Sequence, residues 1–316
     1  MRVTQRMMVG NAVQHMDENL QRLYALSEQV ASGKQFQRVS DHPSQAAAAL
    51  SLRSSLEASK AYLNSAHMAK DWMAGTELAL KQTEEIATRA YELASRGVSD
   101  TSGAEERQGL AEELNEMIHQ IIGQANANHA GSYLFAGFHT NEAPFSGHDG
   151  VDDGSGGEIT DGRFDRLEYR GLVVDPNALP PAEYIQRTIN PGHTIVQNID
   201  GPSVFAPLVE AVAKARDALL QNDSEAIQDT LAGLESARNI VSEARLTNGA
   251  RQRQIGLVGE RIEKAQLELK SLLTEKESVN MAEAISNLRQ QETIYQAVLE
   301  VGQRAISTMS LFEMLR

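Results

Sequence analysis

The chain has 316 residues and a formal net charge of −14, from 43 acidic and 29 basic side chains. No basic patch is available to neutralise phosphates, so nucleic acid is not an expected partner. The absence of cysteine excludes disulfides, thiolate catalysis and cysteine-based zinc sites. Aromatic residues make up only 5% of a chain that is 41% hydrophobic, a mixture that suits long helices in small bundles.

The prolines divide the chain, because seven of the eight fall between Pro144 and Pro207. Proline removes a backbone donor and clashes with the preceding helical turn, so long proline-free stretches can be continuous helix. The sequence therefore predicts a mainly α fold with a small β-rich central domain, its long N- and C-terminal helices packed as a coiled coil or helical bundle. The expected domains are a terminal helical assembly domain (1–33 with 281–316), a long-helix rod (34–139 with 208–280) and a β-rich outer domain (140–207).

The N-terminal half carries signals for three helices. Gly33 is a natural C-cap for the first helix, and Pro43 suits the first turn of a second that should run to about Arg96. Ser102 and Glu105 fit a capping box for a third helix ending near residue 129. The first helix has an apolar stripe at alternating spacings of four and three, the pattern of one coiled-coil seam: Val9, Val13, Met16, Leu20, Leu23, Ser27 and Val30.

The middle of the chain is expected to form short strands. The glycine-bounded apolar run 131–137 indicates a short buried strand, and further strands are expected at 164–169 and 172–174. A short helix at about 209–220 should follow.

We find no constellation for catalysis or for a cofactor, and we expect neither. The eight histidines form no His-Glu-x-x-His pair, and there is no P-loop or Gly-x-Ser-x-Gly elbow. Asp149, Asp153 and Gly154 match three positions of a calcium loop. Val151 and Thr160 stand where oxygen ligands are required, so the segment is better interpreted as a flexible acidic turn.

The C-terminal arm should be one helix from about Glu225 to Leu273 and, after a joint at Asn280, a final helix. Beside the stripe of this final helix lies a second apolar line of Val298, Val301 and Ala305. A helix that is apolar on more than one face is buried by more than one neighbour. The stripe itself, again at spacings of four and three, is Met281, Ile285, Leu288, Glu292, Tyr295, Leu299, Gly302, Ile306 and Met309.

Two interpretations of the terminal stripes remain open: an antiparallel coiled coil that closes a monomer, and contacts between subunits. A membrane-surface helix is disfavoured, because the polar face lacks the lysines and arginines that anionic lipid would require. The sequence has no run of 18 apolar residues for a membrane span and no apolar region of a Sec-type signal peptide at its N-terminus.

Several segments resemble the bacterial flagellin superfamily and, within it, the hook-associated proteins of the hook–filament junction. His42 stands where the family usually has a second aspartate. The segments that carry the resemblance are 2–8, 31–34 (Ala-Ser-Gly-Lys), 38–47 (Arg-Val-Ser-Asp-His-Pro-Ser-Gln-Ala-Ala), 131–137 (Gly-Ser-Tyr-Leu-Phe-Ala-Gly) with Pro144 and Phe145, and the last 36 residues. The central residues 140–205 carry little of it.

The resemblance implies a non-enzymatic structural subunit of the flagellum, located outside the cell at the hook–filament junction. It implies export by the flagellar type III system without a cleaved signal peptide. The implied partners are copies of the chain in a helical tube, a neighbouring hook-associated protein, filament flagellin, and an export chaperone at the C-terminal helix. The alternatives are a minor filament flagellin, an unrelated coiled-coil signalling protein, and an enzyme housed in residues 140–205.

The terminal stripes are the expected assembly interface. An open lattice needs head-to-tail contacts, and the terminal seams would supply them. The candidate residues are Val9, Val13, Met16, Leu20, Leu23, Ile285, Leu288, Tyr295, Leu299, Ile306, Met309, Leu311, Phe312 and Leu315.

Overall fold

The computed structural model describes residues 5–36, 38–40, 42–99, 103–148, 151–152, 158–159, 163–164 and 166–314. The chain divides into two compact units, Met1–Ala58 with Lys264–Arg316, and Ser59–Glu263. These boundaries differ from the three expected domains, whose division stays a prediction.

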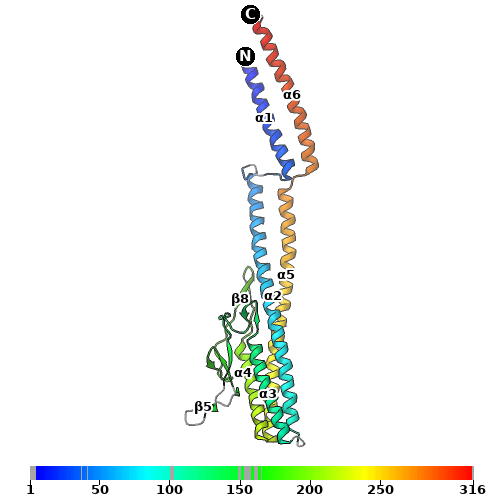
Figure 1. Ribbon diagram of the computed structural model, residues 1–316. Coiled ribbons are helices and arrows are strands. Elements are labelled where there is room, and N and C mark those ends of the chain that lie inside the picture. The colour runs from blue at the N-terminus through cyan, green and yellow to red at the C-terminus, as the bar shows by residue number, and fades with distance from the viewer. Residues whose placement is uncertain are drawn as a thin grey trace. The chain divides into compact units, whose positions relative to one another are not determined.

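Helices dominate both units (Figure 1), as the sequence predicts. In chain order they are α1 (Gln5–Ser32), α2 (Pro43–Gly97), α3 (Ala104–Ala125), α4 (Gly201–Gln221), α5 (Ser224–Glu277) and α6 (Met281–Met314). The predicted positions of α1, α2, α5 and α6 are confirmed to within a few residues. Gly33 ends α1 with a φ of 68°, and its N–H donates to the Gln29 carbonyl at 2.9 Å.

The strands lie between α3 and α4 and are short. They are β1 (Asn128–His129), β2 (Ser132–Tyr133), β3 (Phe145–His148), β4 (Val151–Asp152), β5 (Glu158–Ile159), β6 (Arg166–Tyr169), β7 (Leu172–Val173), β8 (Gln186–Asn190) and β9 (His193–Val196). β3, β6 and β7 form an antiparallel sheet in the order β3-β6-β7, and the other strands pair as two-stranded hairpins. β6 and β7 confirm the strands expected at 164–169 and 172–174.

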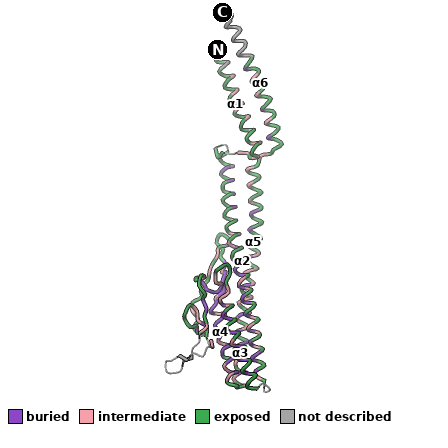
Figure 2. The backbone as a smooth tube through the Cα atoms, in the orientation of Figure 1, coloured by how far each residue is buried: buried purple, intermediate pink, exposed green. Residues whose placement is uncertain are grey.

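The core of the second unit lies where α3 and α4 pack with parts of α2 and α5 (Figure 2). Leu80 of α2, Leu114 of α3, Phe205 of α4 and Ile227 of α5 are all almost fully buried in one cluster. The β8–β9 hairpin forms a smaller cluster, in which Ile189 packs with residues of α2 and α5. The β-rich segment is therefore anchored on the helices rather than built around a core of its own.

The predicted capping box of α3 is wrong. Its N-cap is Gly103, which makes no side-chain cap hydrogen bond, and Ser102 lies outside the described residues. α3 also ends at Ala125 rather than near His129. The Asn126 side chain exchanges two hydrogen bonds with the Phe145 backbone, at 2.7 and 3.0 Å, and so directs the chain into the sheet.

The predicted buried strand at 131–137 is largely wrong. Only Ser132 and Tyr133 pair as a strand, and the buried residues after them lie in turns. The Phe135 ring contacts the Phe205 ring edge-on, with centroids 4.9 Å apart. Burial here comes from packing on α4 rather than from strand pairing.

α4 begins at Gly201, eight residues before the predicted start, so residues 201–207 are helical rather than β-rich. Asp200 caps it by accepting a hydrogen bond from the Ser203 N–H at 3.2 Å, and Pro202 sits in the first turn, where no donor is needed. A Cβ at Gly201 would lie 2.7 Å from Cζ of Phe145 and 2.8 Å from the Phe135 carbonyl oxygen. Glycine is required here by the close approach of the β-rich segment.

Candidate assembly interface on the terminal helices

The two terminal helices pack along each other within the first unit (Figure 1). Their bases are joined by a short antiparallel bridge between Lys34 and Ser278. The Gln35 N–H donates to the Glu277 carbonyl at 2.7 Å, and the Val279 N–H donates to the Gly33 carbonyl at 3.0 Å. The two joints that connect α1 and α6 to the rest of the chain are thus bonded to each other.

A salt bridge fixes this joint to α2. Arg53 Nη2 lies 2.7 Å from Oε1 of Glu277, whose side chain is only 15% exposed. The Gln29 side-chain amide also donates to the Gln35 carbonyl at 2.9 Å. The base of the terminal helix pair is therefore defined by both backbone and side-chain bonds.

The surface buried between α1 and α6 follows one line on each helix, which we call the terminal seam. Its members recur at spacings of four and three, and all are buried or half-buried. On α1 they are Ala12, Met16, Asn19, Leu23, Leu26 and Val30, and on α6 they are Ala284, Leu288, Gln291, Tyr295, Val298 and Gly302.

Two contacts of the terminal seam depend on small or polar residues. Gln291, which is 9% exposed, donates from Nε2 to Oδ1 of Asn19 at 2.9 Å. A Cβ at Gly302 would lie 2.9 Å from Cε of Met16, so glycine lets this side chain approach the α6 backbone.

The predicted stripes lie beside the terminal seam and overlap it only in part. Met16, Leu20, Leu23, Leu288, Tyr295 and Leu299 are half-buried. Val13 is 49% exposed and Ile285 is 38% exposed, so neither is covered by the partner helix. The side chains of Val9, Ile306, Met309, Leu311 and Phe312 lie outside the described part of their helices, and Leu315 lies outside the described residues.

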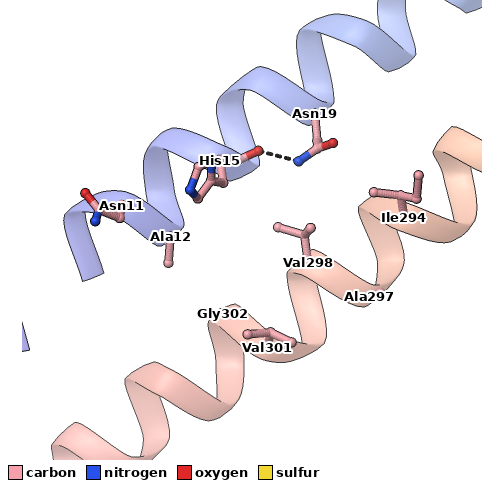
Figure 3. A pocket seen from close by; sticks show the side chains of 9 residues that line it. All are labelled: Asn11, Ala12, His15, Asn19, Ile294, Ala297, Val298, Val301 and Gly302. Atoms are coloured by element: carbon pink, nitrogen blue, oxygen red, sulfur yellow. Dashed lines mark hydrogen bonds between the residues drawn. The ribbon is translucent and has the colours of Figure 1, made fainter. Parts of the chain in front are cut away.

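One side of the helix pair is hollowed into what we call the terminal groove (Figure 3). It encloses about 610 Å³ and opens onto solvent. Val301, 65% exposed, and Ile294, 39% exposed, form part of its apolar wall. The α1 wall is formed by Asn11, Ala12, His15 and Asn19, and the α6 wall by Ile294, Ala297, Val298, Val301 and Gly302.

Sequence reasoning found one wall of this groove and missed the other. Val298 and Val301 belong to the predicted second apolar line of α6. The α1 wall was missed because Asn11, His15 and Asn19 are polar and lie outside the predicted apolar stripe of this helix. The available signal was a second line of α1 at spacings of four and three, which runs through Ala12, Met16, Asn19 and Leu23 and includes two members of this wall.

Within the described ranges, no three histidine or acidic side chains cluster so that they could hold a metal ion. The described helices also fall short of the combined length and apolar character needed to span a membrane. A strongly shifted carboxyl occurs in the β-rich segment, where a hydrogen bond from Arg170 lowers the pKa of Glu183 to about 2. Arg170 also donates to the Ala136 carbonyl at 2.6 Å, so this ion pair ties turns together.

Comparison with known proteins agrees with this architecture. Residues 3–140 match the family model of the bacterial flagellin N-terminal helical region. No curated protein sequence matches the chain.

Solved structures share the fold at low sequence identity. A protein assigned as a flagellar hook-associated protein of Vibrio parahaemolyticus aligns with a TM-score of 0.59 at 16% identity, covering 75% of this chain and all of that one. FlgL of Xanthomonas campestris aligns at 0.58 and 14% identity, covering 71% of this chain and 99% of its own. FlgL of Bacillus cereus aligns with a TM-score of 0.55 at 16% identity, covering 71% of this chain and 99% of its own. Residues 3–140 are thus similar to the flagellin N-terminal helical region, and the chain shares the fold of solved structures of flagellar hook-associated proteins.

Proposed function

We propose that the protein is a structural subunit of the bacterial flagellum at the junction between hook and filament, assembled through its terminal helices. One observation carries the proposal. Apolar side chains such as Val301, Ile285 and Val13 remain exposed on the helix pair, although the terminal seam covers other apolar side chains of the same two helices.

This distribution favours contacts between copies over a self-sufficient monomer. Exposed apolar surface that is not used within the chain favours an interaction site, and Ile294, Val298 and Val301 provide such surface in the terminal groove. A head-to-tail contact between different surfaces of identical subunits generates an open helical assembly. The terminal groove, with its apolar α6 wall, is the surface that we assign to that contact.

The proposed partners are those that a hook-associated role would require. They are further copies of the chain, a neighbouring hook-associated protein, filament flagellin, and an export chaperone that covers the apolar α6 before secretion. We propose export by the flagellar type III system and a final location outside the cell. The structural similarity to hook-associated proteins supports this set of partners.

A minor filament flagellin is the second candidate, because the matched N-terminal region belongs to flagellins in general. Deletion of the gene in the source bacterium separates the two. A junction subunit predicts hooks without filaments and flagellin released into the medium, with filaments restored by the wild-type gene. Normal filaments on the deletion strain would contradict the junction role and favour the minor flagellin.

A further inference from the structure

A second hollow lies within the Ser59–Glu263 unit, between α2 and α5. It encloses about 390 Å³ and is lined by Glu77, Ser242, Arg245, Leu246, Gly249, Gln252 and Arg253. We call it the Gly249 hollow. The residues that line the Gly249 hollow belong to α2 and α5, and none of them lines the terminal groove.

Packing within the chain does not require the glycine that opens this hollow. A Cβ at Gly249 would contact only Nη1 of Arg253, at 3.8 Å. Glycine is the least favourable helix-interior residue after proline, yet here it interrupts a helix of 54 residues. Unlike Gly233 of the same helix, Gly249 lines the hollow, so a larger side chain at this position would fill space that the fold leaves open.

The inner wall of the hollow holds a polar layer whose charges are mostly paired. Arg245 bonds to Glu77, with Nη2 at 2.6 Å from Oε1, and to Glu84. Asn248 is fully buried and donates to the Met73 carbonyl at 2.9 Å. Two buried polar atoms of this layer lack a partner among the described residues, the acceptor Oδ1 of Asn248 and the donor Nε2 of Gln252. A buried donor without an acceptor is costly, so this wall is incomplete.

The outer wall adds a cation and an apolar rim. No described carboxylate lies within salt-bridge distance of Arg253, whose side chain is exposed. Leu246 is 70% exposed at the rim, and Leu257, on the same helix face one turn beyond Arg253, is 66% exposed. The hollow thus offers an amide donor and a guanidinium beside apolar surface.

We propose that the Gly249 hollow is a socket for an aspartate or glutamate side chain from a second copy of this chain. The proposal rests on the proposed function, because it supplies a contact between subunits away from the terminal helices. Copies with a net charge of −14 repel one another on average, so their contacts need local pairs in which a spare cation meets a carboxylate. The carboxylate would accept hydrogen bonds from Nε2 of Gln252 and from the Arg253 guanidinium. The segment of the second copy that carries it would cover Leu246.

The first test fills the hollow in the full-length chain. Gly249→Leu should leave the monomer at least as helical and as heat-resistant as the wild type, because leucine favours helix. It should weaken self-association at least tenfold in sedimentation velocity. Gly233→Leu is the matched control, because Gly233 is exposed on α5 and has no neighbour within 4 Å of an added Cβ. Equal association of the two variants would overturn the socket.

A second test addresses the charge and identifies the occupant. Arg253→Glu should weaken association, Arg253→Lys should retain part of it, and Arg261→Glu, at an exposed site on the same helix, should have little effect. A photo-crosslinking residue at position 246 should, in a mixture of light and heavy isotope-labelled chains, capture an acidic segment of another copy. Crosslinks confined to one chain would contradict the proposal.

The socket and the proposed function can fail separately. Val301→Asp alters the terminal groove and leaves the Gly249 hollow unchanged. If association is lost in Val301→Asp and unaffected in Gly249→Leu and Arg253→Glu, the socket is refuted and assembly through the termini stands. A wild-type chain that stays monomeric at every concentration contradicts both.

Discussion

Gln291 of α6 donates a hydrogen bond to the side-chain oxygen of Asn19 on α1, at 2.9 Å, in the middle of the terminal seam. The same amide lies 3.3 Å from the Asn19 backbone carbonyl. A polar pair inside a helix–helix seam lowers stability relative to apolar packing, but it is satisfied only in one register. This pair therefore defines how α1 and α6 align and where the terminal groove opens.

Replacement of Gln291 by leucine should loosen that alignment. The Asn19 amide oxygen loses its donor, so the helix pair should be weakened by about 1 kcal/mol, with faster hydrogen exchange of amides in both helices. Gln290→Leu, at an exposed position next to it, is the control. Unchanged exchange in Gln291→Leu would show that the pair does not set the register.

Arg107 should be a strong determinant of stability in the second unit. It donates from Nε to the Gly97 carbonyl at 2.9 Å and from Nη1 to Oδ1 of Asn222 at 2.8 Å. It also donates from Nη2 to Oγ of Ser224 at 2.6 Å, so one buried side chain links the ends of α2 and α4 to the start of α5. Arg107→Met leaves these acceptors unpaired and should lower the free energy of unfolding by about 2–4 kcal/mol.

Urea denaturation followed by circular dichroism measures this loss. Gln108→Met, at the exposed neighbouring position, should change the unfolding free energy by less than about 0.5 kcal/mol. If Arg107→Met behaves like this control, the helix ends are held together by apolar packing alone.

The Arg170–Glu183 pair predicts a pH dependence of stability. Its hydrogen bond holds the folded-state pKa of Glu183 at about 2, below the unfolded value of about 4.3. Between these two pKa values the unfolded chain binds more protons than the folded chain. The ion pair therefore makes its full contribution to the free energy of unfolding above about pH 5 and loses it as the pH falls through 2. Because both side chains are over a quarter exposed, we expect about 1 kcal/mol.

Glu183→Gln should therefore be less stable than the wild type at pH 7 and equal to it near pH 2. Glu142→Gln, on an exposed turn, should follow the wild type throughout. A stability difference between Glu183→Gln and the wild type that stays constant over this range would contradict the assignment.

The bridge between the joints can be tested by an engineered disulfide, since the natural chain contains no cysteine. Lys34 and Ser278 lie opposite each other between the two backbone hydrogen bonds. They therefore form a non-hydrogen-bonded antiparallel pair, the kind in which the two Cα atoms lie closer together. Lys34→Cys with Ser278→Cys should oxidise readily to an intrachain disulfide, detected by mass spectrometry. Lys34→Cys with Glu292→Cys should not, and equal yields would show that the joint opens freely.

Periodicity predicted the terminal helices but not their contact surface. Val13 and Ile285 lie on the most apolar lines, yet the buried line runs through Asn19 and Gln291. The two lines share members such as Met16 and Leu288, so spacing alone cannot separate them. The choice depends on pairing across helices, which one helix's sequence does not show.

Other departures have local causes. Pro202 lies in the first turn of α4, where proline is tolerated, and Pro207 lies inside the helix, so neither proline belongs to the β-rich segment to which the sequence pattern assigned it. The apolar run before Gly137 is buried through Phe135 against Phe205 rather than by strand pairing. Arg107 could not be predicted, because its acceptors come from positions up to 117 residues away.

The central claim is that exposed apolar residues of the terminal helix pair bring copies of the chain together. Sedimentation velocity of the full-length wild type, Val301→Asp and Leu172→Asp over a range of concentrations tests it most directly. Val301 is 65% exposed in the terminal groove, and Leu172 is 74% exposed on β7, so the two substitutions are matched in exposure. We predict that Val301→Asp alone shifts association to at least tenfold higher concentration with unchanged helix content. Equal association of all three proteins would contradict the account.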